Sequence, residues 1–269
     1  MYGEEVENGE WLEKNMLKKI AVIILSFNNR QWYARNLASV FSQDYDETFR
    51  VIYIDDGSSD GTGDLVQEYI AERYSGSSAL ITLIRNHVRT GALQNLYNTI
   101  RCCADDEIVI LLDGDDWFAH NKVLRKLNQV YTDTDCWMTY GQYRSWPGNA
   151  ISLSKELPSA VIETNGFRKY EWCSSHLRSF YAWLSKLIKK EDLLAPDGAF
   201  YQMAWDQAIM FPLLEMSGHR AKFINEVLYI YNEANPISDC KLDRELQRQL
   251  EMNIRGRASY RRLEQPIAR

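Results

Sequence analysis

The feature that most constrains the fold is a series of short apolar runs, each followed by polar residues and then by a segment with helical spacing. The runs cover residues 20–26, 49–54, 79–84 and 108–112. The first run, 20–26, is apolar without alternation, as expected of a strand buried on both faces of a parallel sheet. The segments between the runs, 33–41, 65–70 and 91–103, carry apolar residues at helical spacing. Strands that alternate with helices predict an α/β fold with a mainly parallel sheet flanked by helices.

The second half of the chain is less regular. We expect a strand over 137–140, an irregular connection over 142–170, helices over 180–188 and 201–216, an extended segment over 223–231 and a closing helix over 241–263. No internal repeat or low-complexity linker interrupts the chain. We therefore expect a mobile lead-in over 1–16 and a single domain over 17–269.

Composition excludes several classes of protein. With 31 basic and 37 acidic residues, the 269-residue chain has a net charge of −6, and it lacks the basic block typical of a nucleic-acid-binding surface. Its five cysteines show no CxxC spacing, which favours reduced thiols in a cytoplasmic protein. The longest apolar stretch, 20–25, is too short for a transmembrane segment, whereas peripheral contact with a membrane stays open.

The strongest chemical signal is Asp113-Gly114-Asp115-Asp116, directly after the fourth apolar run. Two unit charges about 4 Å apart repel by roughly 4 kcal/mol at an effective dielectric of about 20. A divalent cation relieves that repulsion, and Mg²⁺ typically takes one or two carboxylates together with substrate phosphates. In extended geometry Asp113 and Asp115 project to the same side, and Gly114 leaves room for a close ligand. The alternative is an acidic turn that caps the next helix.

A second acidic turn, Asp55-Asp56-Gly57-Ser58, follows the second apolar run. Gly57 permits a sharp turn, and an aspartate just past a strand can bind a base or a ribose. The alternative is a turn that leads into a helix near Thr62, with Asp60 or Ser59 as its cap. Both interpretations hold together if Asp60 caps the helix and Asp56 binds the ligand. Ligands of such sheets bind beyond the carboxyl ends of the strands, so we expect both acidic turns at that edge.

Three segments together resemble the family 2 inverting glycosyltransferases of the GT-A fold. In chain order they are Val22-Ile23-Ile24-Leu25-Ser26-Phe27-Asn28, Ile54-Asp55-Asp56-Gly57-Ser58 and Leu112-Asp113-Gly114-Asp115-Asp116. The family has a strand that ends near Ser, Tyr or Asn, then a DDGS turn, then an LDxDD metal motif. The match covers roughly residues 18–130 well and the rest loosely.

The resemblance implies a Rossmann-like sheet in which residues 17–130 bind a nucleotide sugar and a less regular region, 131–269, faces the acceptor. It implies transfer of a sugar from a nucleotide-diphosphate donor, with uracil the usual base, to a hydroxyl of a glycan, lipid or protein. It also implies a cofactor, Mn²⁺ or Mg²⁺, and inversion at the anomeric carbon.

The resemblance gives roles to residues at the donor site. Asp56 would hydrogen-bond the base, and Ser26 would lie against the nucleotide. Residues 86–95 stand where the family has an Asn…Gly…Ala-x-Asn pattern, although the glycine comes later here. Arg89, in this segment, is a candidate donor contact, and the alternative is a solvated arginine.

The same resemblance makes the LDxDD motif the metal site. Asp113 would hold the ribose, and Asp115 would ligate the cation that bridges the diphosphate. Asp113 and Gly114 would complete the metal and donor site.

The family also carries an acidic residue, often in a Glu-Asp pair, that removes the acceptor proton. Asp206 is the best match, with Trp205 in place of the glutamate, and the alternative is a charge favoured by the helix dipole. His176 and Arg178 are candidates for contact with the acceptor or the diphosphate, although such residues are more often ordinary polar groups. The segment Tyr229-Ile230-Tyr231-Asn232 resembles the family's C-terminal segment near the active site, but residue type assigns it no role.

Three other functions compete. A sugar nucleotidyltransferase should carry a glycine-rich phosphate loop near its N-terminus, but residues 24–28 contain no glycine. A phosphohydrolase with a nucleophilic aspartate should carry Asp-x-Asp-x-Thr/Val, which residues 113–117 lack. A catalytically inactive relative that binds a nucleotide sugar or a protein partner stays open because of Trp205.

Overall fold

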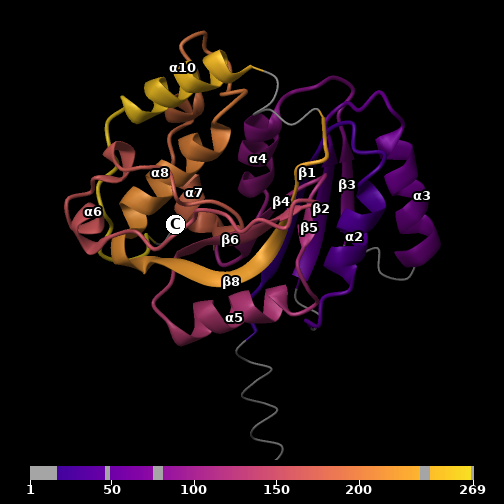
Figure 1. Ribbon diagram of the computed structural model, residues 1–269, viewed down its shortest axis with the longest axis horizontal. Helices are drawn as coiled ribbons and strands as arrows, with labels where there is room; N and C mark the ends of the chain where they lie inside the picture. The colour runs from indigo at the N-terminus through magenta and orange to yellow at the C-terminus, as the bar shows by residue number, and fades with distance from the viewer. Residues whose placement is uncertain (1–16, 46–48, 75–80, 237–242, 268–269) are drawn as a thin grey trace, which may run out of the picture.

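Figure 1 shows the fold, a computed structural model that describes residues 17–45, 49–74, 81–236 and 243–267. The expected lead-in over 1–16 lies outside the described residues. Among those described, eight strands form one sheet in the order β3-β2-β1-β4-β7-β6-β8-β5. The strands are β1 Ile20–Ser26, β2 Phe49–Asp55, β3 Ile81–Arg85, β4 Ile108–Asp113, β5 Trp117–Phe118, β6 Met138–Trp146, β7 Arg178–Tyr181 and β8 Ala221–Asn232. Strands β3, β2, β1 and β4 are parallel, which confirms the predicted fold class.

Helices cover both faces of this sheet (Figure 1). They are α2 Tyr33–Phe41, α3 Thr62–Tyr74, α4 Ala92–Arg101, α5 Val123–Asp133, α6 Ser159–Glu163, α7 Ala182–Lys186, α8 Trp205–Ser217 and α10 Arg244–Arg255, with 3-10 turns η1 Phe167–Lys169, η2 Lys190–Leu193 and η3 Gly218–Arg220. In β1, Ile20, Val22 and Ile24 join one buried cluster with apolar residues of α2, α3 and α5. The intervening residues join a second cluster with α4, α7 and α8. Burial on both faces explains why β1 is apolar without alternation, whereas the edge strand β3 is mostly exposed.

The register of the parallel strands brings their carboxyl ends to one edge. Ser26 pairs with Asp55, and Leu25 pairs with Asp113. Neighbouring strands lie about 4.8 Å apart, so the polar residues that follow β1, β2 and β4 must be close in space.

The second half differs from the sequence prediction in several elements. Strand β6 continues to Trp146, so the expected irregular connection begins later and contains α6. Residues 180 and 181 belong to β7 instead of a helix, because the chain pairs there with β4 and β6 before α7 begins. The short strand β5 was not predicted.

The closing helix α10 ends at Arg255, earlier than predicted, and the chain then continues without helix toward α8. A buried ion pair between Arg168 and Glu215 anchors this region, with Nε to Oε1 at 2.6 Å. The Glu215 carboxylate also accepts a hydrogen bond from the backbone N–H of Tyr260. Arg168 also donates from Nη1 to the backbone carbonyl of Ile254 in α10 at 2.6 Å, which holds α10 beside α8 (Figure 1). Within the residues that the structure describes, no helix is both long and apolar enough to cross a membrane.

Candidate active site

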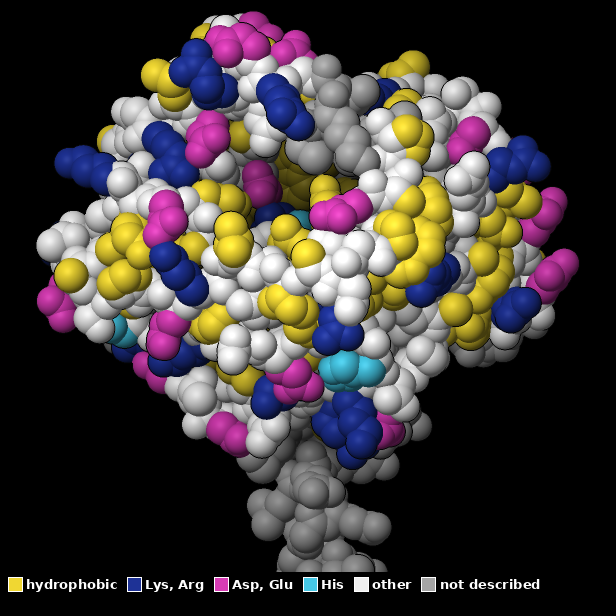
Figure 2. Space-filling view, viewed as in Figure 1, with side chains coloured by type: hydrophobic (Ala, Val, Ile, Leu, Met, Phe, Trp, Pro, Cys, Tyr) yellow, Lys and Arg dark blue, Asp and Glu magenta, His cyan; other side chains and the backbone are white. Residues whose placement is uncertain are grey.

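One pocket opens beyond the carboxyl ends of β1, β2 and β4, and the face of the molecule in Figure 2 is hollowed near its centre. The pocket is lined by Leu25, Ser26, Phe27, Asn29, Asp56, Arg89, Ala92, Asn95, Asp113, Asp115, Asp116, His176, Arg178, Ala204, Trp205, Asp206, Tyr231, Asn235 and Gln247. Every site residue predicted from the sequence lines it except Gly114, which lies between two lining residues. The fold therefore brings the predicted residues together, and their chemical roles stay predictions.

Asp56 is held at the end of β2 by the loop that follows β3. Its Oδ1 accepts hydrogen bonds from the Asn86 side chain (2.7 Å) and the Thr90 backbone (2.9 Å). Its Oδ2 accepts one from the Gly91 backbone (2.8 Å). Burial alone would raise the pKa of Asp56, but these hydrogen bonds outweigh it and lower the pKa below its usual value. Asp56 is thus a fixed carboxylate at neutral pH.

Glycines make the two acidic turns compact. Gly57 has a φ of +74°, and a Cβ there would lie 2.9 Å from the Arg89 backbone nitrogen. A Cβ on Gly114 would lie 2.6 Å from the Ser26 Cβ. The sharp turn predicted at Gly57 is confirmed, and Gly114 lets the acidic turn lie against the end of β1. Asp60 accepts a hydrogen bond from the Thr62 backbone, which confirms its predicted role at the beginning of α3.

The acidic turn carries carboxylates that disfavour one another's charge. Burial and the neighbouring Asp115 carboxylate raise the pKa of Asp113 to about 7. The same two causes, in the same order, raise the pKa of Asp116 well above its usual value. Asp116 is 1% exposed and accepts hydrogen bonds from the Tyr229 hydroxyl (2.6 Å) and the Asn232 backbone (2.7 Å). Asp116 is therefore tied to β8 through both carboxylate oxygens, and all three aspartates line the pocket.

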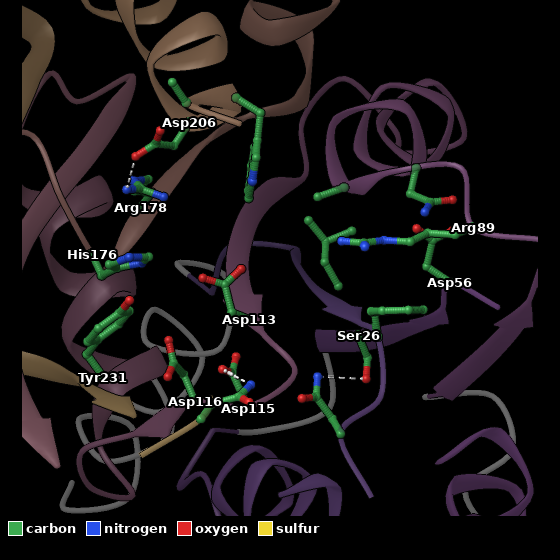
Figure 3. A pocket seen from close by; sticks show the side chains of 18 of the residues that line it. Ser26, Asp56, Arg89, Asp113, Asp115, Asp116, His176, Arg178, Asp206 and Tyr231 are labelled. Atoms are coloured by element: carbon green, nitrogen blue, oxygen red, sulfur yellow. Dashed lines mark hydrogen bonds and ion pairs between the residues drawn. The ribbon is translucent and has the colours of Figure 1, made fainter. Parts of the chain in front are cut away.

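The opposite wall comes from β7 and α8. Arg178 donates from Nη2 to Oδ2 of Asp206 at 2.8 Å, and its side chain is 4% exposed. Figure 3 shows this pair facing Asp113, with Asp56, Ser26 and Arg89 on the far side of the pocket. His176 stacks on Tyr229 with ring centroids 4.4 Å apart. Burial, followed by the charge of Arg178, lowers the pKa of His176 well below its usual value, so its imidazole is neutral.

The charges that line the pocket favour a cation. Five lining residues are aspartates, and two, Arg89 and Arg178, are basic. Arg178 is paired with Asp206, and the Arg89 guanidinium lies 4.1 Å from the centre of the Phe27 ring. A nucleotide diphosphate would add further negative charge, so a divalent cation at Asp113 and Asp115 fits the site. Among the described residues no group of three or more His, Cys, Asp or Glu side chains is arranged to hold a metal ion, so diphosphate oxygens and water would supply the other ligands.

Several lining residues were not predicted. Asn95 stands in the segment 86–95 that was singled out, and its Nδ2 is buried with no hydrogen-bond partner in the described structure. Asn235 and Gln247 reach the pocket from segments more than a hundred residues beyond the acidic turn, and nothing local in the sequence marks them. Trp205 lines the pocket directly before Asp206.

A family model described as Glycosyl transferase family 2 matches residues 21–190. The poly(ribitol-phosphate) beta-N-acetylglucosaminyltransferase TarP of Staphylococcus aureus is 27% identical over 176 residues, which are 65% of this chain and 50% of TarP. The chain thus spans about half the length of this curated relative.

Solved structures share the fold at low sequence identity. TarS 1–349 of S. aureus in complex with UDP-GlcNAc aligns with a TM-score of 0.58 and 17% identity, covering 81% of this chain and 59% of that one. The mannosyltransferase PcManGT of Pyrobaculum calidifontis, in complex with GDP-Man and Mn²⁺, aligns with a TM-score of 0.52 and 19% identity, covering 87% and 65%.

Proposed function

This chain belongs to glycosyl transferase family 2 and has the GT-A fold, and on that premise we propose that it transfers a sugar from a nucleotide-diphosphate donor to an acceptor hydroxyl with a divalent cation. The observation that carries the proposal is the convergence of Asp56, Asp113, Asp115 and Asp206 on one pocket at the carboxyl edge of the sheet. The acceptor is a glycan, a lipid or a protein.

The donor nucleotide binds at the ends of β1 and β2 in this proposal. Oδ2 of Asp56 accepts one hydrogen bond, from Gly91, and a carboxylate oxygen has two lone-pair sites. Oδ2 can therefore also accept the ring N–H of a uracil or a guanine. The buried Nδ2 of Asn95, which also lines the pocket, is a donor for a base carbonyl. We favour UDP-sugars, and UDP-GlcNAc is the first donor to test because TarS was solved with it.

Asp115 and Asp113 would hold Mn²⁺ or Mg²⁺ together with diphosphate oxygens. When bound, the cation would neutralise charge that builds on the leaving diphosphate. Asp113 would also bind the ribose, and its place between the Arg178–Asp206 pair and the Asp56 side of the pocket supports this role (Figure 3). Arg89 and the neutral His176 supply further polar contacts to the donor or the acceptor.

Asp206 is the proposed general base. It would accept the proton of the acceptor hydroxyl while that oxygen attacks the anomeric carbon from the face opposite the diphosphate, which inverts the configuration. Arg178 pairs with Oδ2 of Asp206, and Oδ1 accepts a hydrogen bond from the Gln207 backbone (2.9 Å). These two contacts fix the carboxylate toward the pocket.

The test combines binding and turnover. We expect UDP-GlcNAc, another UDP-sugar or GDP-mannose to raise the melting temperature in the presence of Mn²⁺, and the matching donor to be consumed when acceptor mixtures are supplied. Asp206→Asn should keep donor binding and lose transfer, whereas Asp133→Asn, at an exposed aspartate of α5, should keep both.

Two outcomes would contradict the proposal. If no uridine or guanosine diphosphate binds, the site does not take a nucleotide donor. If donors bind but neither wild type nor Asp133→Asn transfers sugar to any acceptor, the inactive-relative alternative raised by Trp205 is favoured.

A further inference from the structure

The segment at the end of β8 contacts the acidic turn along its whole length. This segment comprises residues 229–235, and its first part, 229–232, was singled out in the sequence without a role. It is separated from the acidic turn by more than a hundred residues. Trp117 and Phe118 of β5, just after the acidic turn, pair with Ile230 and Tyr229 of β8, so the backbone itself brings the two segments together.

Each residue of the acidic turn that carries a carboxylate is hydrogen-bonded to this segment. The Tyr229 hydroxyl donates to Asp116, and the Asn232 backbone N–H donates to the other oxygen of the same carboxylate. The Asp113 backbone N–H donates to the Tyr229 hydroxyl at 3.2 Å, and that hydroxyl lies 3.4 Å from Oδ2 of Asp113.

Asparagine side chains hold the third carboxylate-bearing residue, Asp115. The Asn232 Nδ2 donates to the Asp115 backbone carbonyl at 3.1 Å. The Asn235 Nδ2 donates to Oδ2 of the Asp115 carboxylate at 2.7 Å. Both asparagines are buried, with 1% and 5% of their surface exposed.

The chemistry of these donors matters for a cation site. A lysine or an arginine at position 235 would neutralise Asp115 and compete with a cation, whereas a carboxamide orients the carboxylate and leaves its charge intact. Carboxylates that ligate metals are commonly fixed by such hydrogen bonds, and loss of these contacts typically lowers metal affinity about 10- to 100-fold. Burial keeps water from replacing the amide.

We propose that Asn235 is a positioning residue for the divalent cation: its amide fixes one oxygen of Asp115, while Asn232 fixes the backbone of the same residue. This inference rests on the proposed function, because it takes Asp115 as a cation ligand. The end of β8 would then complete the metal site without touching the metal.

The test measures Mn²⁺ binding directly, by electron paramagnetic resonance of free Mn²⁺ in the presence of UDP. We expect Asn235→Ala to weaken Mn²⁺ binding by about 10-fold or more, with UDP binding in EDTA unchanged. The matched control is Asn165→Ala, which removes a partly buried asparagine hydrogen bond to the Tyr260 backbone, and neither of these residues lines the pocket. It should lower the melting temperature and leave Mn²⁺ affinity unchanged. If Asn235→Ala does not fold, Asn235→Ser, whose hydroxyl is too short to span the same distance, should show the same loss.

The outcomes separate this proposal from the proposed function. Asp115→Asn should abolish Mn²⁺ binding. If Asp115→Asn abolishes Mn²⁺ binding but the Mn²⁺ affinity of Asn235→Ala is within about threefold of that of wild type, the positioning role of Asn235 is wrong. The proposed cation site then stands. If wild type itself binds no Mn²⁺ with UDP, both are wrong.

Discussion

Replacement of Asp113 by asparagine should make the metal-free protein more stable while it removes donor binding. Asp113 is partly buried beside Asp115, and its pKa in the folded protein is about 7, against a usual value of 3.8. This rise of about three units corresponds to as much as ~4 kcal/mol of unfavourable free energy when the carboxyl is ionised in the folded state. Asparagine has nearly the same shape and no charge, so Asp113→Asn should remove most of that cost.

The pH dependence follows from the direction of the shift. A carboxyl that binds its proton more tightly when folded contributes stability at low pH and loses it as the pH rises. In EDTA, the contribution of Asp113 to the free energy of unfolding of wild type should therefore fall between about pH 4 and pH 7. It should stay low at higher pH. The advantage of Asp113→Asn should be greatest near pH 8 and vanish near pH 4.

Urea denaturation at several pH values in EDTA measures this difference, with Asp133→Asn as the control for loss of a surface charge. Addition of UDP and Mn²⁺ at 100 times the Kd should then offset about 2.7 kcal/mol of this difference, because only wild type binds the ligand. If Asp113→Asn is no more stable than wild type at pH 8, or if its advantage does not change with pH, then burial and the Asp115 charge do not destabilise the ionised Asp113 carboxylate as we describe.

Two further predictions concern close packing at Gly114 and the buried ion pair of Glu215. Gly114→Ala would bring a methyl group 2.6 Å from the Ser26 Cβ, and overpacking of this kind typically costs about 1–3 kcal/mol. It should lower the melting temperature and weaken UDP binding, whereas Gly256→Ala, whose Cβ meets nothing closer than 3.4 Å, should do neither. Glu215→Ala should lower the free energy of unfolding by about 3–5 kcal/mol because it leaves the buried Arg168 unpaired, and equal urea midpoints for variant and wild type would contradict this.

The sequence predicted the donor half of the fold well because its signals there are local. Strands β1, β2 and β4 are mainly apolar runs, and the polar residues that matter lie at or directly after their ends, as with Asp113 and Asp56. Because ligands of such sheets bind at the carboxyl edge, the sequence also predicts that these segments lie in one site, without knowledge of tertiary contacts.

The second half was harder for a physical reason. Residues 178–188 form one mainly apolar run that contains both a strand and a helix, and the boundary is set by pairing of β7 with β4, far away in the sequence. A short apolar run fits either structure by periodicity alone. Similarly, Asn232 and Asn235 acquire their contacts only when β8 meets the acidic turn, so residue type could not reveal them.

The most direct test of the central claim compares nucleotides with and without a diphosphate. The claim is that a divalent cation joins the acidic turn at Asp113 and Asp115 to the diphosphate of the donor. Calorimetric titration should show that Mn²⁺ strengthens the binding of UDP or GDP by about 10-fold or more, which is about 1.4 kcal/mol, and leaves the binding of uridine or guanosine unchanged. Equal affinity for the diphosphates with Mn²⁺ and with EDTA would contradict it.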